Sequence, residues 1–271
     1  MHSRASGKGQ IRKIDKMKVL LWLLTLGLVL QTGLVNAKRY EEIGGRHQGD
    51  IVLTDSQKDA EAAGGTTLVQ DAYKWVKGIV PYAIDRVFST SQVEQIRLAM
   101  EEISSRSCVR FVEHAKQREF LNITGSPTGC WSTLGMNVLS NQLNLDPAGC
   151  LGVGEIVHQL LHVLGLTHPQ SRPDRDLYVL VQQDAVDPTQ AQNLQKYQQG
   201  VIEDFGIPYD YESILHCQSD AFGSPTSGRS SVVPLNDVEI GQRETLSLKD
   251  VRKLNKMYDY EFCGICVRGY C

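Results

Sequence analysis

The chain has 271 residues, which suits one domain of about 200 residues plus processing segments. Hydrophobic residues make up 41% of it, enough for a sizeable core, and the formal net charge is only −3. This charge argues against a general nucleic-acid partner or an anionic membrane surface, because both require clustered positive charge. Seven cysteines indicate an oxidising compartment.

The N-terminus has the features of a secretory signal peptide. The apolar run 19–30 follows lysines and precedes a small-residue cleavage pattern that ends at Ala37. The run is too short to span a bilayer comfortably, so an N-terminal membrane anchor is the weaker alternative. We therefore predict a signal peptide over residues 1–37, with Met17 as an alternative start, and a secreted, extracellular protein with no membrane partner.

The first half of the remaining chain predicts a mixture of helix and strand. Ser91 and Glu94 have the spacing of a capping box at the start of a helix. Segments 108–112 and 120–123 are typical of strands. Asn122 begins an N-x-T sequon, so a secreted chain is expected to be glycosylated there, with the side chain facing solvent. The apolar positions that follow the box at helical spacing are Val93, Ile96, Met100 and Ile103.

Two histidines four residues apart dominate the segment 155–168. On a helix this spacing places His158 and His162 on one face, one turn apart. Gly165 can end the helix through a left-handed residue, and the turn then brings His168 back toward the pair. Three converging imidazoles form a tripod for zinc with a fourth position open. A histidine pair at this spacing usually binds nothing, so the glycine and the third histidine carry the prediction.

The pattern H-x-x-x-H-x-x-G-x-x-H resembles the zinc signature of the metzincins, except that Gln159 stands where the signature has its general-base Glu. The residues that follow resemble the astacin family, whose motif continues as H-E-H-x-R-x-D-R-D. Pro169 and Gln170 replace the Glu and His of that motif. The residues that match it are Arg172, Asp174, Arg175 and Asp176.

The resemblance, which extends from about Thr66 to Cys263, implies an α+β, two-lobed metzincin fold. Its N-terminal lobe would be a twisted sheet with two long helices, the second carrying the zinc motif, and its C-terminal lobe mostly irregular with a closing helix. It implies a metallopeptidase domain over 66–264 and a short tail over 265–271. It also implies one Zn²⁺ per chain and a monomer that binds a protein or peptide in its cleft. The apolar positions expected on the closing helix are Leu248, Val251, Leu254 and Tyr258.

Residues 38–65 are polar, lack strong periodicity and correspond to the prosegment of astacin zymogens. That prosegment contains F-x-G-D, and its Asp occupies the open zinc position. Here Gly49 and Asp50 match this motif and His47 replaces the Phe. The resemblance therefore implies that Asp50 blocks the zinc, although a Gly-Asp pair by itself also fits a turn. The family's mature N-terminus pairs with the Glu that Pro169 replaces, so this contact is lost.

The segment 209–217 resembles the family's S-I-M-H-Y Met-turn. Leu215 replaces the Met and keeps its volume and apolarity, so we expect little structural loss. Cys217 replaces the Tyr that donates a hydrogen bond to the transition-state oxyanion. A cysteine has no comparable reach.

The family resemblance also implies two disulfides. One joins Cys108 to Cys263, and the other joins Cys130 to Cys150. The remaining cysteines are Cys217, Cys266 and Cys271. The last two could pair in the tail and leave Cys217 as a thiol in the cleft, but the sequence does not fix this.

Gln159 decides the expected activity. It can hydrogen-bond a water but has no basic lone pair at neutral pH, and general acid–base catalysis is worth roughly 10²–10⁴-fold. We therefore expect a zinc metalloendopeptidase fold that binds zinc and is proteolytically impaired, a pseudopeptidase. Two alternatives stay open. One is an active endopeptidase that hydrolyses internal peptide bonds in proteins with Glu155 or another carboxylate as its base. The other is a fold that no longer binds zinc because Pro169 tilts the third ligand.

Overall fold

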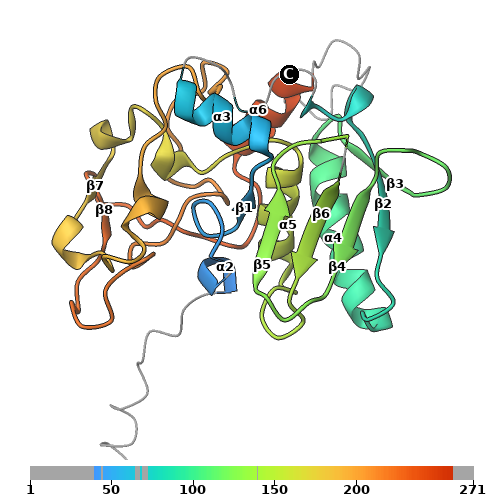
Figure 1. Ribbon diagram of the computed structural model, residues 1–271, viewed down its shortest axis with the longest axis horizontal. Helices are drawn as coiled ribbons and strands as arrows, with labels where there is room; N and C mark the ends of the chain where they lie inside the picture. The colour runs from blue at the N-terminus through green and yellow to red at the C-terminus, as the bar shows by residue number, and fades with distance from the viewer. Residues whose placement is uncertain (1–39, 44, 65–67, 69–72, 139, 259–271) are drawn as a thin grey trace, which may run out of the picture. The chain divides into compact units, whose positions relative to one another are not determined.

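The protein is described by a computed structural model over residues 40–43, 45–64, 68, 73–138 and 140–258. The predicted signal peptide, the tail, Cys263, Cys266 and Cys271 lie outside these residues. Within them, no helix is both long enough and apolar enough to cross a membrane. The chain is a mixed α+β structure, as predicted (Figure 1).

A six-stranded sheet forms one side of the fold, with the strand order β1-β5-β6-β4-β2-β3. All neighbouring strands are parallel except β5 and β6, which are antiparallel. The strands are β1 (Ile51–Val52), β2 (Ile79–Ile84), β3 (Arg110–Glu113), β4 (Leu121–Thr124), β5 (Cys130–Thr133) and β6 (Asn141–Leu145). Asn122 lies on β4 with its side chain half-buried, so glycosylation there remains a prediction.

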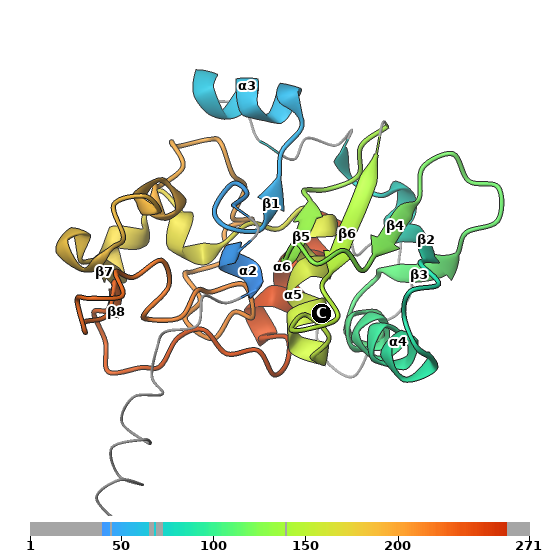
Figure 2. The same cartoon turned by 60° about the horizontal axis from the view of Figure 1, so that its bottom comes forward.

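The predicted prosegment is structured, although its sequence showed no strong periodicity. It forms α2 (Tyr40–Ile43), β1 and α3 (Asp55–Ala63). Strand β1 pairs with β5, which would otherwise be the edge of the sheet. Helix α3 begins with a capping box in which Thr54 and Gln57 bond reciprocally, a signal that the sequence did contain. Figures 1 and 2 both place α2 and β1 of this segment between the sheet and the part of the fold that holds β7 and β8.

Helix α4 (Thr90–Arg106) has a different cap from the predicted one. Ser89 is the N-cap: its Oγ accepts from Gln92 N at 3.4 Å, and Gln92 Oε1 accepts from Ser89 N at 2.8 Å. The capping box predicted at 91–94 is therefore wrong, because Ser91 lies inside the first turn. Phe88, directly before the cap, is buried in the core and fixes where the chain enters the helix.

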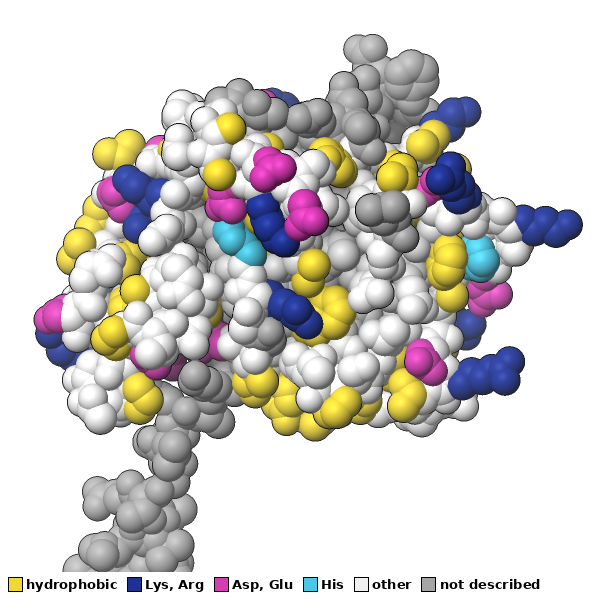
Figure 3. All heavy atoms as spheres, viewed as in Figure 1, with side chains coloured by type: hydrophobic (Ala, Val, Ile, Leu, Met, Phe, Trp, Pro, Cys, Tyr) yellow, Lys and Arg dark blue, Asp and Glu magenta, His cyan; other side chains and the backbone are white. Residues whose placement is uncertain are grey.

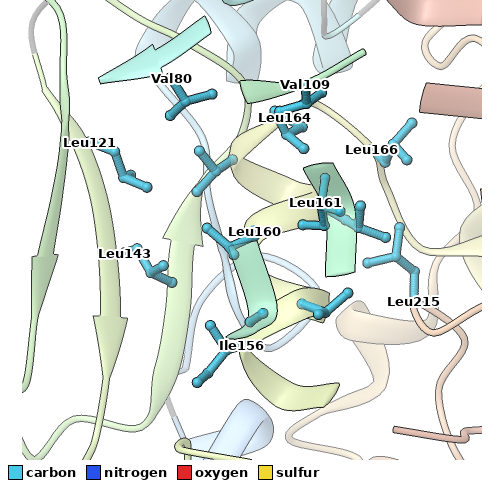
Figure 4. Close-up of a cluster of buried hydrophobic side chains, with 14 of the residues drawn as sticks. Val80, Val109, Leu121, Leu143, Ile156, Leu160, Leu161, Leu164, Leu166 and Leu215 are labelled. Atoms are coloured by element: carbon cyan, nitrogen blue, oxygen red, sulfur yellow. The ribbon is translucent and has the colours of Figure 1, made fainter. Parts of the chain in front are cut away.

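The core lies between the sheet and the helices α4 and α5 (Val153–Val163) (Figure 4). On α4, the predicted face is buried at Ile96, Met100 and Ile103 and half-buried at Val93. On α5, every residue from Ile156 to Val163 is buried. A helix packed on all sides is held rigidly. This makes α5 suited to fix the direction of its polar side chains.

Helix α6 (Leu248–Met257) closes the described chain. Val251 and Leu254 are buried as predicted, but Leu248 is 50% exposed, which corrects the prediction for that residue. It follows the N-cap Ser247 directly and lies in the first turn, before the helix meets the core. The helix also buries Asp250, which accepts from Ser213 Oγ at 2.6 Å and from Ile214 N at 3.0 Å. This contact fixes the turn that lies beside the histidines.

Residues 164–247, all of which the structure describes, contain only short 3-10 turns and a two-stranded sheet. That sheet pairs β7 (Val179–Val181) with β8 (Val232–Pro234) (Figure 2). Arginine side chains hold this irregular chain together. Arg172 donates two 2.8 Å hydrogen bonds to Asp174, and Arg175 donates to two backbone carbonyls at 2.8 Å. On the face in Figure 3, acidic and basic side chains are interspersed, in keeping with the small net charge.

A disulfide joins Cys130 on β5 to Cys150, just before α5. It is the pair that the family resemblance implied. Cys108 is also disulfide-bonded, but Cys263 lies outside the described residues, so the pairing of these two remains a prediction.

Peptide mapping without reduction is expected to find Cys130 linked to Cys150 and Cys108 linked to Cys263. Replacing Cys130 and Cys150 by Ser should lower the free energy of unfolding by ~3 kcal/mol, because their 20-residue separation restricts the unfolded chain. Urea denaturation of the purified protein measures this change. Another partner for Cys130 in the peptide map would contradict the assigned pairing.

Candidate metal centre

Helix α5 and the turn after it bring three histidines together. His158 and His162 lie on one face of α5, and Gly165, at φ 102°, turns the chain back so that His168 joins them. All three residues are buried, with 4% exposure or less. The sequence-predicted tripod is therefore assembled, and Pro169 does not displace it. That proline begins a 3-10 turn, for which its fixed φ is suited.

The second nitrogen of each histidine is held by an acceptor. His158 Nδ1 lies 2.9 Å from Ile214 O, and His162 Nδ1 lies 2.8 Å from Leu166 O. A carbonyl oxygen only accepts, so each Nδ1 carries the proton and each Nε2 keeps a lone pair. His168 Nδ1 lies 3.1 Å from Gln48 Oε1, in the prosegment.

The carboxylate of Asp50 completes the group. Its Oδ2 lies 2.9 Å from His158 Nε2 and 3.5 Å from His162 Nε2, and its Oδ1 lies 3.4 Å from His168 Nε2. Gly49, at φ 101°, makes the approach possible, since a Cβ there would meet Phe222 at 3.0 Å. The carboxylate stands where the tripod is open, which is where the sequence resemblance placed it.

The four side chains fit a zinc ion. Their ligand atoms lie within 4.8 Å of one another, and His158 Nε2 and His162 Nε2 are 3.1 Å apart. Zinc bonds of about 2.0–2.1 Å in a tetrahedron require ligand atoms roughly 3.3 Å apart. Asp50 Oδ1 is buried and accepts no hydrogen bond in the described part of the chain. A cation at the centre would satisfy the facing lone pairs and this carboxylate oxygen together.

The pKa shifts agree with the ionisation that a metal requires. Burial pushes the pKa of Asp50 upward, but the positive charges that His162 and His168 carry when protonated outweigh it and hold that pKa well below its usual range. Burial lowers the pKa of His168 well below its ordinary value. An ionised carboxylate and a neutral imidazole are the forms that bind zinc.

A family model described as Astacin, a family of peptidases, matches residues 67–259, well over half of the chain. The chain belongs to the astacin family. Its four-residue group is placed to bind a metal ion, and the metal of the astacin family is zinc.

Relatives in this family come from several animals. Zinc metalloproteinase nas-4 of Caenorhabditis elegans is 35% identical over 238 residues, which cover 85% of this chain and 74% of that protein. High choriolytic enzyme 1 of Oryzias latipes is 36% identical over 183 residues, 67% of this chain and 66% of that protein. The astacin-like metalloendopeptidase of Gallus gallus is 35% identical over 190 residues, 69% of this chain but only 46% of that protein.

A solved structure supports the same assignment. High choriolytic enzyme 1, described as a hatching enzyme zinc-protease from medaka fish, superposes with a TM-score of 0.64 at 35% identity. The match covers 69% of this chain and 92% of that one.

The chain differs from the family's motifs at Gln159, Cys217 and Leu215, and the first two lie at the site. Gln159, in place of the astacin Glu, is fully buried, and its Nε2 donates to Asp50 Oδ2 at 2.6 Å. Cys217, in place of the astacin Tyr, is buried and lines a small cavity together with Asp50 and His168. Its sulfur lies outside the group of ligand atoms, as expected from its short side chain. Leu215, in place of the Met, is buried in the core (Figure 4).

Sequence analysis missed three polar residues near the site. Gln48 contacts His168, and its place beside Gly49 in the prosegment motif was the only available signal. Glu41 on α2 forms a bidentate ion pair with Arg243, with bonds of 2.9 and 2.8 Å. Burial alone would raise the pKa of Glu41, but Arg243 lowers it to about 2. No local pattern indicated this pair, because its partners are 202 residues apart in the chain.

Zinc analysis tests the metal centre. The purified secreted chain is expected to carry about one zinc per chain, and His162→Ala should remove it, since two histidines and one carboxylate leave the site incomplete. The melting temperature should fall by roughly 10 °C or more. His114→Ala, a histidine outside the site, is the matched control and should keep its zinc. Metal content near zero in the unmutated chain would contradict the assignment.

The Glu41–Arg243 pair predicts a pH dependence. The pKa of Glu41 lies near 2 in the folded protein and near 4.5 otherwise, so the ionised form stabilises the folded protein fully above about pH 4.5. This contribution is lost as the pH falls toward 2. Glu41→Gln should therefore be destabilising at pH 7, and its difference from the unmutated protein should shrink between pH 4.5 and 2. Urea unfolding of both proteins without metal measures this, and a difference independent of pH would contradict it.

Proposed function

We propose that this astacin-family protein is secreted, binds zinc through His158, His162 and His168, and has lost most or all peptidase activity. The observation that carries the proposal is the position of Gln159. Its amide lies 2.6 Å from the carboxylate that stands at the open side of the tripod. The group that would take a proton there is an amide, which is not basic at neutral pH.

The lost base has a definite cost. Zinc bound by the three histidines supplies Lewis-acid activation of a scissile carbonyl and of water. Gln159 can orient a water by hydrogen bonding but cannot take its proton or pass one to the leaving amine. General acid–base catalysis contributes about 10²–10⁴-fold to such a rate.

The oxyanion donor is also missing. Cys217 N donates to Gln170 Oε1 at 3.1 Å, which fixes the backbone of the turn. From this position the short thiol side chain does not replace a phenol that reaches toward the substrate oxygen. Loss of one such donor costs about 10²–10³-fold in kcat in enzymes that depend on it. Zinc binding requires neither residue, so the metal site and the peptidase activity are separable.

The active-peptidase alternative requires another base. Glu155 is the nearest candidate along the helix, but its Oε2 lies beside Gly152, at the start of α5. Asp50 is the carboxylate that joins the histidine group in the described residues. As a ligand at the open position it opposes hydrolysis, because it excludes water from the metal.

The remaining functional proposals rest on sequence. The signal peptide over residues 1–37 and the Cys130–Cys150 disulfide both support an extracellular location. We infer a monomer, glycosylated at Asn122, whose domain spans 66–264 and whose prosegment, residues 38–65, places Asp50 on the zinc. The relatives are named as peptidases, so a protein or peptide is the class of ligand proposed for the cleft.

The decisive test restores the base. With the prosegment removed at a cleavage site engineered near residue 66, Gln159→Glu should raise casein hydrolysis from background by about 10²-fold or more. Adding Cys217→Tyr should raise it further. Both gains should appear in kcat, since both groups act on the transition state. Chelation should abolish the activity.

Gln170→Glu is the matched control, because it makes the same chemical change at another buried glutamine beside the third ligand. It should bring no activity. If the unmutated domain already cleaves casein and Gln159→Glu is no faster, another group acts as the base and the active-peptidase alternative is correct.

A further inference from the structure

Gln159 contacts the prosegment through one short hydrogen bond. Its Nε2 donates to Asp50 Oδ2 at 2.6 Å, and the two residues are 0% and 1% exposed. An ionised carboxylate only accepts, so the amide nitrogen must face it. Gln159 Oε1 accepts no hydrogen bond from the described residues. The amide is thus oriented so that its nitrogen bonds Asp50, although this leaves Oε1 without a hydrogen bond from the described residues.

A glutamate in this position would oppose the same contact. Two ionised carboxylates would meet at hydrogen-bond distance in a buried site, and one of them would have to take up a proton. The amide removes this conflict and replaces it with a charge-assisted hydrogen bond. The residue that removes the general base is therefore also the residue that holds Asp50.

The chain that follows Asp50 is part of the domain core. Ile51 is 0% exposed and Leu53 6%. Backbone hydrogen bonds join Ser132 N to Asp50 O at 2.9 Å and Leu134 N to Val52 O at 3.2 Å. The carboxylate is thus presented from the turn directly before β1, which is anchored in the sheet.

Two further anchors hold this segment, one on α3 and one beside the metal group. Gln57 on α3 is 1% exposed, and its Nε2 donates to Leu68 O at 3.2 Å and Leu134 O at 3.0 Å. On the other side, Glu41 pairs with Arg243, and their side chains are only 16% and 11% exposed. Removal of this segment would leave buried polar groups without partners, which is costly.

We propose that Gln159 positions Asp50 as a permanent fourth protein ligand, so that the centre is a closed, structural zinc site of three histidines and one aspartate. The prosegment is then a resident part of the fold, not an inhibitor to be removed. The proposal rests on the zinc binding in the proposed function. Closed sites with four protein ligands are typical of structural zinc. A peptide that adds to the edge of β5 must first displace β1.

The test uses the full secreted chain loaded with Co²⁺, whose visible spectrum reports a change of ligand, and acetohydroxamate as a small competing ligand. In the unmutated protein the spectrum should resist acetohydroxamate. Gln159→Glu should respond at a concentration at least about 10-fold lower, as loss of one charge-assisted bond implies. Asp50→Ala should respond at a similarly low concentration.

A double-variant comparison separates positioning from a direct effect on the probe. In the Asp50→Ala background, Gln159→Glu should change the response by less than about 3-fold, because there is no carboxylate left to hold. An equal change in both backgrounds would overturn the role of Gln159. An unmutated protein that responds as readily as Asp50→Ala would overturn the closed site. Absence of bound Co²⁺ and Zn²⁺ in the unmutated protein would instead refute the proposed zinc binding.

Amide hydrogen exchange provides a readout that does not depend on the probe. Ser132 N and Leu134 N donate to the prosegment, so both should be strongly protected in the zinc-loaded protein. Gln159→Glu should speed their exchange about 10-fold or more, whereas Leu143 on the central strand β6 should be unaffected. Equal exchange at Ser132 and Leu134 in both proteins would contradict a resident prosegment held by Gln159.

Discussion

The structure depends on one buried electrostatic constraint. Three Nε2 lone pairs and one carboxylate converge within 4.8 Å in a space that water does not reach. Each histidine is oriented by a separate part of the chain, because its Nδ1 donates to an acceptor outside the group. His158 depends on Ile214, whose turn is fixed by Asp250 of α6, and His162 depends on the turn at Gly165. Segments far apart in the chain, from Asp50 to Asp250, are therefore connected through the metal group.

The proposed prosegment contributes to the fold in two ways: it covers a sheet edge, and it supplies buried negative charges. Strand β1 covers β5, whose backbone would otherwise be open at the edge of the sheet. Asp50, directly before that strand, brings a negative charge to the metal group, and Glu41 brings another to the buried guanidinium of Arg243. The same short segment thus places one negative charge at the metal group and another at Arg243. This explains why the segment is ordered although its own sequence has little periodicity.

Gln159 connects the proposed loss of catalysis to this arrangement. A Glu at this position would bring a second carboxylate against that of Asp50 in the same small buried volume. Here the amide and the carboxylate are complementary, with one donor facing one acceptor at 2.6 Å. In our proposal, the exchange of an acid for an amide therefore removes the general base and also holds Asp50 at the open position of the tripod.

The sequence alone determined the features that depend on residues close together in the chain: the zinc-bearing helix, its end at Gly165, and the spacing of the three histidines. Asp50 and the Cys130–Cys150 pair could be assigned only through the family resemblance. The cap at Ser89 was misplaced because Ser91 offers an equally good local pattern, and only the burial of Phe88 decides between them. The ion pair of Glu41 with Arg243 and the bond of Gln159 to Asp50 were decided by tertiary structure, since folding brings together groups that are far apart in sequence and local propensity carries no record of them.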